Sequence, residues 1–234
     1  MTSIDPLSQI PQQEIPTFKV VLLGETAVGK SCLISRYVNN TFLSNFVPTM
    51  GGYFTSKEIF YKDINKKIKL DIWDTAGQEK YRSITKMFYK DASVAILVYD
   101  ITRQESFLEI KNFWYQEVKE NSPENLVIAI VGNKKDLYEY EEVNKEDCEN
   151  FANEVGAVFK ETSAKTGGGV DEMFQLIGMK LIAPENYDKI VNGENWKKKA
   201  KKSIILNNTN NDNGAKDSQF MKGSMIEEKK KCCS

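Results

Sequence analysis

The segment GETAVGKS, residues 24–31, decides the fold of this 234-residue chain. The apolar run TFKVVLL precedes this segment, and the amphipathic stretch GKSCLISRYV overlaps its end. The first pattern predicts a buried strand and the second predicts a helix, with a turn containing glycine between them. A strand, a tight turn and a helix in this order are typical of an α/β domain with a largely parallel sheet.

The same alternation of strands and helices continues to about residue 182. Two β-rich runs joined by a short DINK turn indicate a hairpin, and short apolar strands then alternate with helical patterns. Continuous apolar strands between helices indicate a mostly parallel sheet covered on both faces, which binds ligands at the carboxyl ends of its strands. The further strands are expected at 53–62, 66–74, 93–100, 125–133 and 157–164, and the later helices at about 104–121, 145–155 and 170–182.

Composition changes on both sides of this domain. Residues 1–16 are polar and contain three prolines, which predicts a flexible N-terminal arm. Residues 183–234 include the polar runs NWKKKAKK and NNTNNDNG. Such a segment cannot bury enough apolar surface to offset the entropy of ordering, so we expect a disordered tail. One folded domain, residues 17–182, is therefore predicted between the arm and the tail.

Bulk properties exclude several classes of protein. The formal net charge is −1, so the chain is no polycation for nucleic acid. Four cysteines, two of them adjacent at the C-terminal end, do not form a disulfide framework, and this favours a reducing compartment. The N-terminal residues lack the basic start and apolar core of a signal peptide. No apolar run approaches the roughly 18 residues that a membrane span needs.

The segment 24–31 fits the pattern G-x-x-x-x-G-K-[ST] of a phosphate-binding loop. Gly24 and Gly29 allow the backbone to wrap closely around phosphates, with amide N–H groups pointing inward. The following helix adds its positive N-terminal end. Lys30 supplies a point charge for the outer phosphates, and the Ser31 hydroxyl can bind Mg²⁺. The other residues expected to contact the nucleotide here are Glu25, Thr26, Ala27, Val28 and Cys32.

The segment NKKD, residues 133–136, indicates which base accompanies the phosphates. The Asp136 carboxylate can accept two hydrogen bonds from the ring and exocyclic N–H groups of guanine. Adenine lacks this donor pair, so an unpaired buried carboxylate would reject it. Asn133 can connect this loop to the phosphate loop, and the stem of Lys134 can lie on the base.

A second loop, TSAK at residues 162–165, follows the next predicted strand. Ser163 can brace this loop, and the Ala164 N–H can donate to the guanine carbonyl. Lys165 is also expected to contact the nucleotide. Phe42 lies in a predicted loop with nothing obvious to bury it. An aromatic edge against the guanine would explain this position, although Phe42 could equally be a minor core residue.

The segment DIWDTAGQE, residues 71–79, ends a predicted strand with a carboxylate. Asp74 can hold Mg²⁺ through a water molecule, and Thr49 is expected to provide a second hydroxyl ligand. The Gly77 N–H can reach a γ-phosphate, and Gln78 can orient the attacking water. The alternative interpretation of Gln78 is a solvated loop residue.

Three functions remain open from these residues alone. The first is a GTP hydrolase in which Gln78 and Lys30 act at the γ-phosphate. The second is a scaffold that binds GTP without hydrolysing it, an interpretation that Gln78 disfavours. The third is an adenine-nucleotide kinase on the same loop, which predicts a lid with arginines and no carboxylate such as Asp136.

The ordered motifs GETAVGKS, PTMGG, WDTAGQE, NKKD and ETSAK resemble those of the Ras-like small GTPases. The resemblance covers residues 17 to about 182. Within that superfamily, KLDIWDTAGQEKYRSI and the terminal CCS are similar to the Rab family, and VYDIT with GAVFKETSAK is similar to its endosomal branch. The resemblance implies a P-loop domain with a six-stranded, mostly parallel sheet flanked by helices. It also implies a switch that binds GTP or GDP with Mg²⁺, hydrolyses GTP slowly and regulates vesicle trafficking.

The Rab resemblance also implies a hydrophobic effector face, which we assign to Phe54, Trp73 and Tyr89. Ordinary packing within the core or on the sheet is the alternative for these residues. The segment MGGYF replaces the more usual IGVDF-like segment, and FYKDA replaces the commoner YYRGA. These departures leave the choice of effector open.

The C-terminal end resembles the double-cysteine ends of Rabs, in which both cysteines are geranylgeranylated. The resemblance therefore implies lipidation of Cys232 and Cys233, and two lipid chains give stable anchoring. The partners implied are a guanine-nucleotide exchange factor, a GTPase-activating protein, a GDP-dissociation inhibitor and effectors that bind the switch regions. The implied location is the cytoplasmic face of vesicle or endosomal membranes, in exchange with the cytosol.

Overall fold

The strands predicted from the sequence form a single sheet. The computed structural model describes residues 14–42, 49, 52–75 and 88–190, and the first compact unit of the chain extends to Tyr187. The sheet has six strands in the order β2-β3-β1-β4-β5-β6. Their bounds are β1 Thr17–Leu23, β2 Tyr53–Tyr61, β3 Lys66–Asp74, β4 Val94–Asp100, β5 Val127–Asn133 and β6 Val158–Glu161.

The sheet is parallel except at one edge. β2 pairs antiparallel with β3, as the hairpin prediction requires, and every other neighbouring pair is parallel. All seven residues of the central strand β4 are buried because helices cover both faces of the sheet there, whereas β3 alternates between buried and partly exposed residues. The predicted fold class, a mostly parallel six-stranded sheet flanked by helices, is confirmed. All five parallel strands end at the same edge of the sheet.

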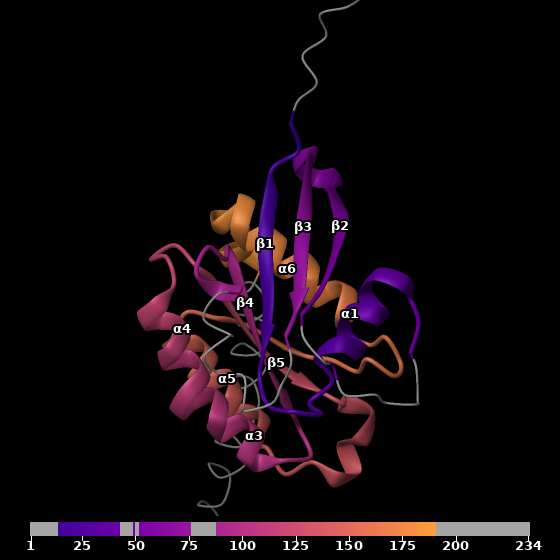
Figure 1. The fold of residues 1–234 in the computed structure, drawn as a ribbon, viewed down its shortest axis with the longest axis vertical. Coiled ribbons are helices and arrows are strands. Elements are labelled where there is room, and N and C mark those ends of the chain that lie inside the picture. Colours follow the sequence, from indigo (N-terminus) through magenta and orange to yellow (C-terminus); the bar gives the residue numbers. More distant parts are fainter. Residues whose placement is uncertain (1–13, 43–48, 50–51, 76–87, 191–234) are drawn as a thin grey trace, which may run out of the picture. The chain divides into compact units, whose positions relative to one another are not determined.

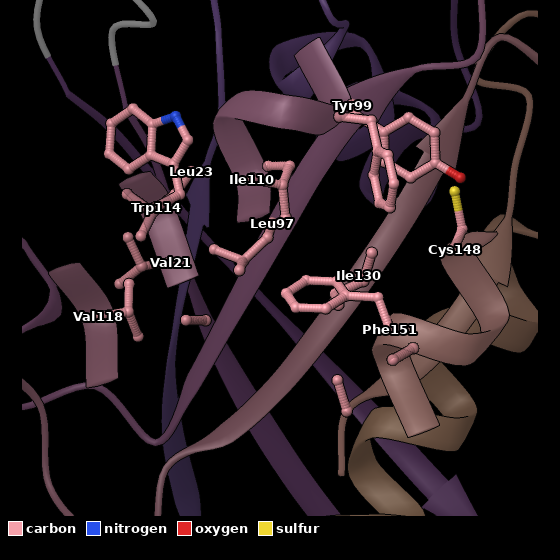
Figure 2. Packing of buried hydrophobic residues seen from close by; sticks show 14 of the residues in the cluster. Val21, Leu23, Leu97, Tyr99, Ile110, Trp114, Val118, Ile130, Cys148 and Phe151 are labelled. Carbon is pink, nitrogen blue, oxygen red and sulfur yellow. The ribbon is translucent and has the colours of Figure 1, made fainter. Parts of the chain in front are cut away.

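One face of the sheet is covered by the helices between β4 and β6 (Figure 1). These are α3 (Gln104–Glu109), the π-helical segment η4 (Ile110–Trp114), α4 (Tyr115–Asn121) and α5 (Lys145–Glu154). Side chains alternate between the two faces of a strand, so every second residue of β1, β4 and β5 enters this layer. Figure 2 shows the resulting core, which includes Val21, Leu97, Ile130, Trp114 and Phe151.

The opposite face is covered by α1 (Lys30–Asn39) and α6 (Val170–Ile182), which contact each other. The Tyr37 ring of α1 stacks on the Phe174 ring of α6, with 3.6 Å between the ring centroids. The Tyr61 hydroxyl of β2 donates to the Gln175 carbonyl of α6 at 3.0 Å. These contacts hold the antiparallel edge of the sheet against α6.

Two features of the helices differ from the prediction. The pattern at 104–121 predicts one regular helix, but its middle turn is π-helical from Ile110 to Trp114. Beyond α6, residues 184–190 are also helical, and Tyr187 is only 6% exposed. Within the described residues, no helix is both long and apolar enough to cross a membrane.

Candidate nucleotide-binding site

The predicted phosphate loop connects β1 to α1 at the carboxyl edge of the sheet. Positive φ angles occur at Gly24 (138°), Ala27 (64°) and Gly29 (97°), so the chain turns tightly between the strand and the helix. A Cβ atom at Gly24 would collide with the Val98 carbonyl of β4. Glycine is therefore required at this position for the loop to lie directly on the sheet.

Lys30, the first residue of α1, folds back over this loop. Its Nζ donates to the Gly24 carbonyl at 2.8 Å and to the Glu25 carbonyl at 2.9 Å, and the residue is 6% exposed. Burial lowers the pKa of Lys30 to about 8, although the Asp74 and Glu25 carboxylates oppose this shift. The cation is thus partly desolvated and held by neutral carbonyls inside a loop of inward-facing backbone. An anion bound in the loop would supply the missing negative charge.

Three oxygen-bearing side chains from distant segments meet beside this loop. Ser31 Oγ lies 2.7 Å from Thr49 Oγ1, and Ser31 also donates to Asp74 Oδ2 in a very short hydrogen bond. The other carboxylate oxygen, Asp74 Oδ1, is buried without a hydrogen-bond partner among the described residues. Burial raises the pKa of Asp74 despite the opposing contacts with Ser31, Lys30 and Thr49. Two hydroxyls and an unsatisfied carboxylate are the hard oxygen ligands that suit Mg²⁺.

Asn133, at the end of β5, joins the phosphate loop to the 162–165 loop. Its Nδ2 donates to the Val28 carbonyl at 2.9 Å, and its Oδ1 accepts from Ala164 N at 3.2 Å and from Thr162 Oγ1 at 3.3 Å. Asn133 is 1% exposed, and a Cβ at Gly29 would collide with its amide. The bond to the Val28 carbonyl is the contact expected between the 133–136 loop and the phosphate loop, whereas the bonds to the 162–165 loop were not predicted. The Ala164 N–H, expected at the guanine carbonyl, here donates to Asn133.

Asp136 lies opposite the 162–165 loop. Ser163 Oγ donates to Asp136 Oδ1 at 2.6 Å, and Lys165 Nζ lies 3.9 Å from Asp136 Oδ2. Ser163 Oγ also accepts from the Thr166 N–H at 3.1 Å, so this hydroxyl joins the Asp136 carboxylate to the 162–165 loop. Lys134 has a positive φ of 67°. Its Nζ pairs with the buried carboxylate of Asp100 at 2.6 Å, a contact that the sequence did not predict.

Asp100 and Arg103 are further site residues that the sequence interpretation missed. Arg103 Nη2 donates to the Thr26 carbonyl of the phosphate loop at 3.0 Å, and its Nε lies 3.6 Å from Asp100 Oδ2. The end of β4 thereby connects the phosphate loop with the Lys134 side chain. Asp100 is the last residue of an apolar strand, a position that indicates a site residue in an α/β sheet.

The predicted effector residues do not all lie together. The rings of Phe54 and Trp73 are 5.0 Å apart between centroids, and Phe54 is 48% exposed. Tyr89, by contrast, is 1% exposed, and its hydroxyl donates to Glu117 Oε1 at 2.7 Å. The assignment of Tyr89 to the exposed face is therefore wrong, because its side chain packs inward. The ring of the neighbouring residue Phe88 lies 6.0 Å from the Trp73 ring, measured between centroids.

Several predicted residues are placed only in part. Phe42 is 37% exposed, and its contact with the base stays a prediction. Cys32 is half-buried in the first turn of α1. Gly77, Gln78, Cys232 and Cys233 lie outside the described residues.

The strand, loop and helix geometry and the clustered side chains define the class of this protein as a P-loop nucleotide-binding protein. The Ras family model matches residues 19–183. The chain is 43% identical over 163 residues to the human Ras-related protein Rab-22A. The aligned region covers 70% of this chain and 82% of that relative. It is 42% identical over 179 residues to the human Ras-related protein Rab-31. This aligned region covers 76% of this chain and 90% of that relative. With mouse Rab-31 the identity is 44% over 167 residues, covering 71% and 84%.

The chain therefore belongs to the Ras family, and within it to the Rab-like small GTPases. It binds guanine nucleotide and hydrolyses GTP, and it acts in vesicle trafficking.

Proposed function

We propose that the chain is a membrane-tethered GTP switch whose nucleotide is held with Mg²⁺ by the residues described above. Ser31, Thr49 and Asp74 would hold the ion, and Lys30 would neutralise the outer phosphates. The convergence of these three oxygen-bearing side chains beside the phosphate loop is the observation that carries the proposal. The ion would supply neutralisation of charge at the phosphate oxygens.

Guanine selectivity is assigned to the loops at the ends of β5 and β6. Asp136 would accept from the guanine N–H groups while Ser163 holds its carboxylate at 2.6 Å. Asn133 would keep this pair of loops at a fixed distance from the phosphates through its bond to the Val28 carbonyl. Adenine would leave the Asp136 carboxylate without its donors.

Hydrolysis is proposed to need little covalent chemistry from the protein. Gln78 would orient the attacking water, the Gly77 N–H would bind the γ-phosphate, and Lys30 would stabilise the developing charge. A GTPase-activating protein would add an arginine. For Ras, such an arginine accelerates GTP hydrolysis about 10⁵-fold. We therefore expect slow intrinsic turnover, and rapid unassisted hydrolysis would contradict this part of the proposal.

The exposed Phe54 ring, together with the partly buried rings of Trp73 and Phe88 beside it, is proposed to contact effectors in the GTP state. An exchange factor and a GDP-dissociation inhibitor would complete the cycle. Cys232 and Cys233 are proposed to carry two prenyl chains that anchor the protein to the cytoplasmic face of a membrane. The similarity of the VYDIT and GAVFKETSAK segments to the endosomal branch of Rabs supports an endosomal membrane.

The Mg²⁺ site is tested by the rate of GDP dissociation with and without the ion. In the wild type, chelation with EDTA should accelerate dissociation strongly. Ser31→Ala removes the hydroxyl that joins Thr49 and Asp74, so its dissociation should be fast and nearly independent of Mg²⁺. Ser35→Ala is the matched control on the same helix, because the Ser35 hydroxyl contacts only the exposed Thr41 hydroxyl in the described network. An unchanged response to Mg²⁺ in Ser31→Ala would refute the assignment.

A further inference from the structure

Arg36, in the last turn of α1, binds the loop that follows β6. Its Nε donates to the Ala164 carbonyl at 2.8 Å, and its Nη2 donates to the Lys165 carbonyl at 2.8 Å. Its Nη1 donates to both the backbone carbonyl and Oδ1 of Asn40, each at 3.0 Å. The four acceptors are neutral oxygens, and they come from two segments that are more than 120 residues apart in the chain.

The contact with two consecutive carbonyls fixes two peptide planes. In a trans peptide the C=O and the following N–H point in opposite directions, and the described residues contain no cis peptide. Because the Ala164 carbonyl faces Arg36, the Lys165 N–H points away from α1. Because the Lys165 carbonyl also faces Arg36, the Thr166 N–H points away from α1 as well.

The second plane leads directly to the base-reading carboxylate. The Thr166 N–H donates to Ser163 Oγ at 3.1 Å, and Ser163 Oγ donates to Asp136 Oδ1 at 2.6 Å. The orientation that Arg36 imposes on this peptide is therefore passed through one hydroxyl to the carboxylate. The first plane leaves the Lys165 N–H directed to the side opposite Arg36.

The rest of this loop does not replace Arg36. Gly167 N donates to the Ser163 carbonyl at 2.8 Å, and Gly168 N donates to Thr166 Oγ1 at 3.2 Å, so these bonds close the loop on itself. The Arg36 stem lies against Gly167, where an added Cβ would be 3.5 Å from Arg36 Cδ. The planar guanidinium presents its donors in a fixed fork, and a lysine ammonium cannot reproduce that geometry.

We propose that Arg36 is a positioning residue for guanine recognition. It aims the Lys165 N–H at the base carbonyl and, through Thr166 and Ser163, holds Asp136 toward the base N–H groups. The bond to the Asn40 backbone carbonyl, at 3.0 Å, anchors the guanidinium to the end of α1. This inference rests on the proposed guanine site. It adds a residue that orients the groups that bind the base and does not itself contact the base.

The test compares binding of GDP with binding of 6-thioguanosine diphosphate, in which a sulfur atom replaces the base carbonyl oxygen. Sulfur accepts hydrogen bonds weakly, so a well-aimed N–H should make the wild type prefer GDP by about tenfold. In Arg36→Ala and Arg36→Lys the donor is no longer fixed, and the preference should fall towards one. Affinities are measured by displacement of a fluorescent GDP analogue at fixed Mg²⁺, and thermal melting confirms that each variant is folded.

Asn40→Gly is the matched control. It removes one of the four acceptors, keeps the backbone carbonyl and permits the positive φ of 53° at this position. Its preference for GDP should equal that of the wild type. A merely structural role for Arg36 would weaken both nucleotides by the same factor and leave the preference unchanged, which would overturn the inference.

Three further outcomes are decisive. A wild-type preference near one would also overturn the inference, because no fixed donor would then read the carbonyl. If Arg36→Ala does not fold, Arg36→Lys alone decides between the two results. Failure of the wild type to prefer GDP over ADP would instead refute the proposed function itself.

Discussion

Replacing Asn133 with alanine should destabilise the domain and loosen the nucleotide together, because one amide joins three parts of the site. The change removes hydrogen bonds of 2.9, 3.2 and 3.3 Å to the Val28 carbonyl, the Ala164 N–H and the Thr162 hydroxyl. These three partners are at most 3% exposed, so water cannot readily replace the amide. At about 1 kcal/mol for each bond, the expected loss in the free energy of unfolding is about 3 kcal/mol.

Urea denaturation of wild type and Asn133→Ala, at one fixed excess of GDP and Mg²⁺, measures this loss. Thr162→Val is the matched control, since it removes only the longest of the three bonds and should cost about 1 kcal/mol or less. The dissociation rate of GDP should rise in Asn133→Ala well above its value in the control. A loss below about 1 kcal/mol in Asn133→Ala would mean that the Asn133 amide does not stabilise the three loops together.

Three other predictions concern parts of the domain outside the nucleotide contacts. Gly178→Ala would place a methyl group against the Tyr61 hydroxyl and should cost about 1–3 kcal/mol in urea denaturation. Burial opposes ionisation of Glu161, but its two paired lysines lower its pKa overall, so its stabilising effect is present above about pH 4.3 and is lost on acidification. Glu161→Gln should therefore be less stable than wild type at pH 7, with the difference shrinking below pH 4. Burial raises the pKa of Cys148 to about 11, so its alkylation at pH 7.5 should be negligible in the folded protein and rapid in urea.

The strands were predictable because short β-rich runs alternate with helical patterns along the chain. The π-helical turn was not predictable, since Ile110 and Trp114 also fit a regular helix and only packing against the sheet distinguishes the two. The choice between Phe88 and Tyr89 failed for a related reason. Two adjacent aromatic residues carry no local signal for which of them faces the core.

The chemistry of the site was predictable where a residue type has few other uses at that spacing. Ser31, Thr49 and Asp74 were expected together, and the structure brings them together. Arg36 had no such signal, because a basic residue in the last turn of a helix is common. Its partners lie far along the chain, so only the folded structure reveals the contact.

Binding of guanine nucleotide at this site is proposed to depend on the Asp136 carboxylate. The most direct measurement is to purify the protein without added nucleotide, release the bound ligand by heat and identify it by chromatography, for the wild type and for Asp136→Asn. Guanine nucleotide is expected in the wild type, and a clear loss of it is expected in the variant. Adenine nucleotide in the wild type, or no bound nucleotide at all, would contradict this proposal.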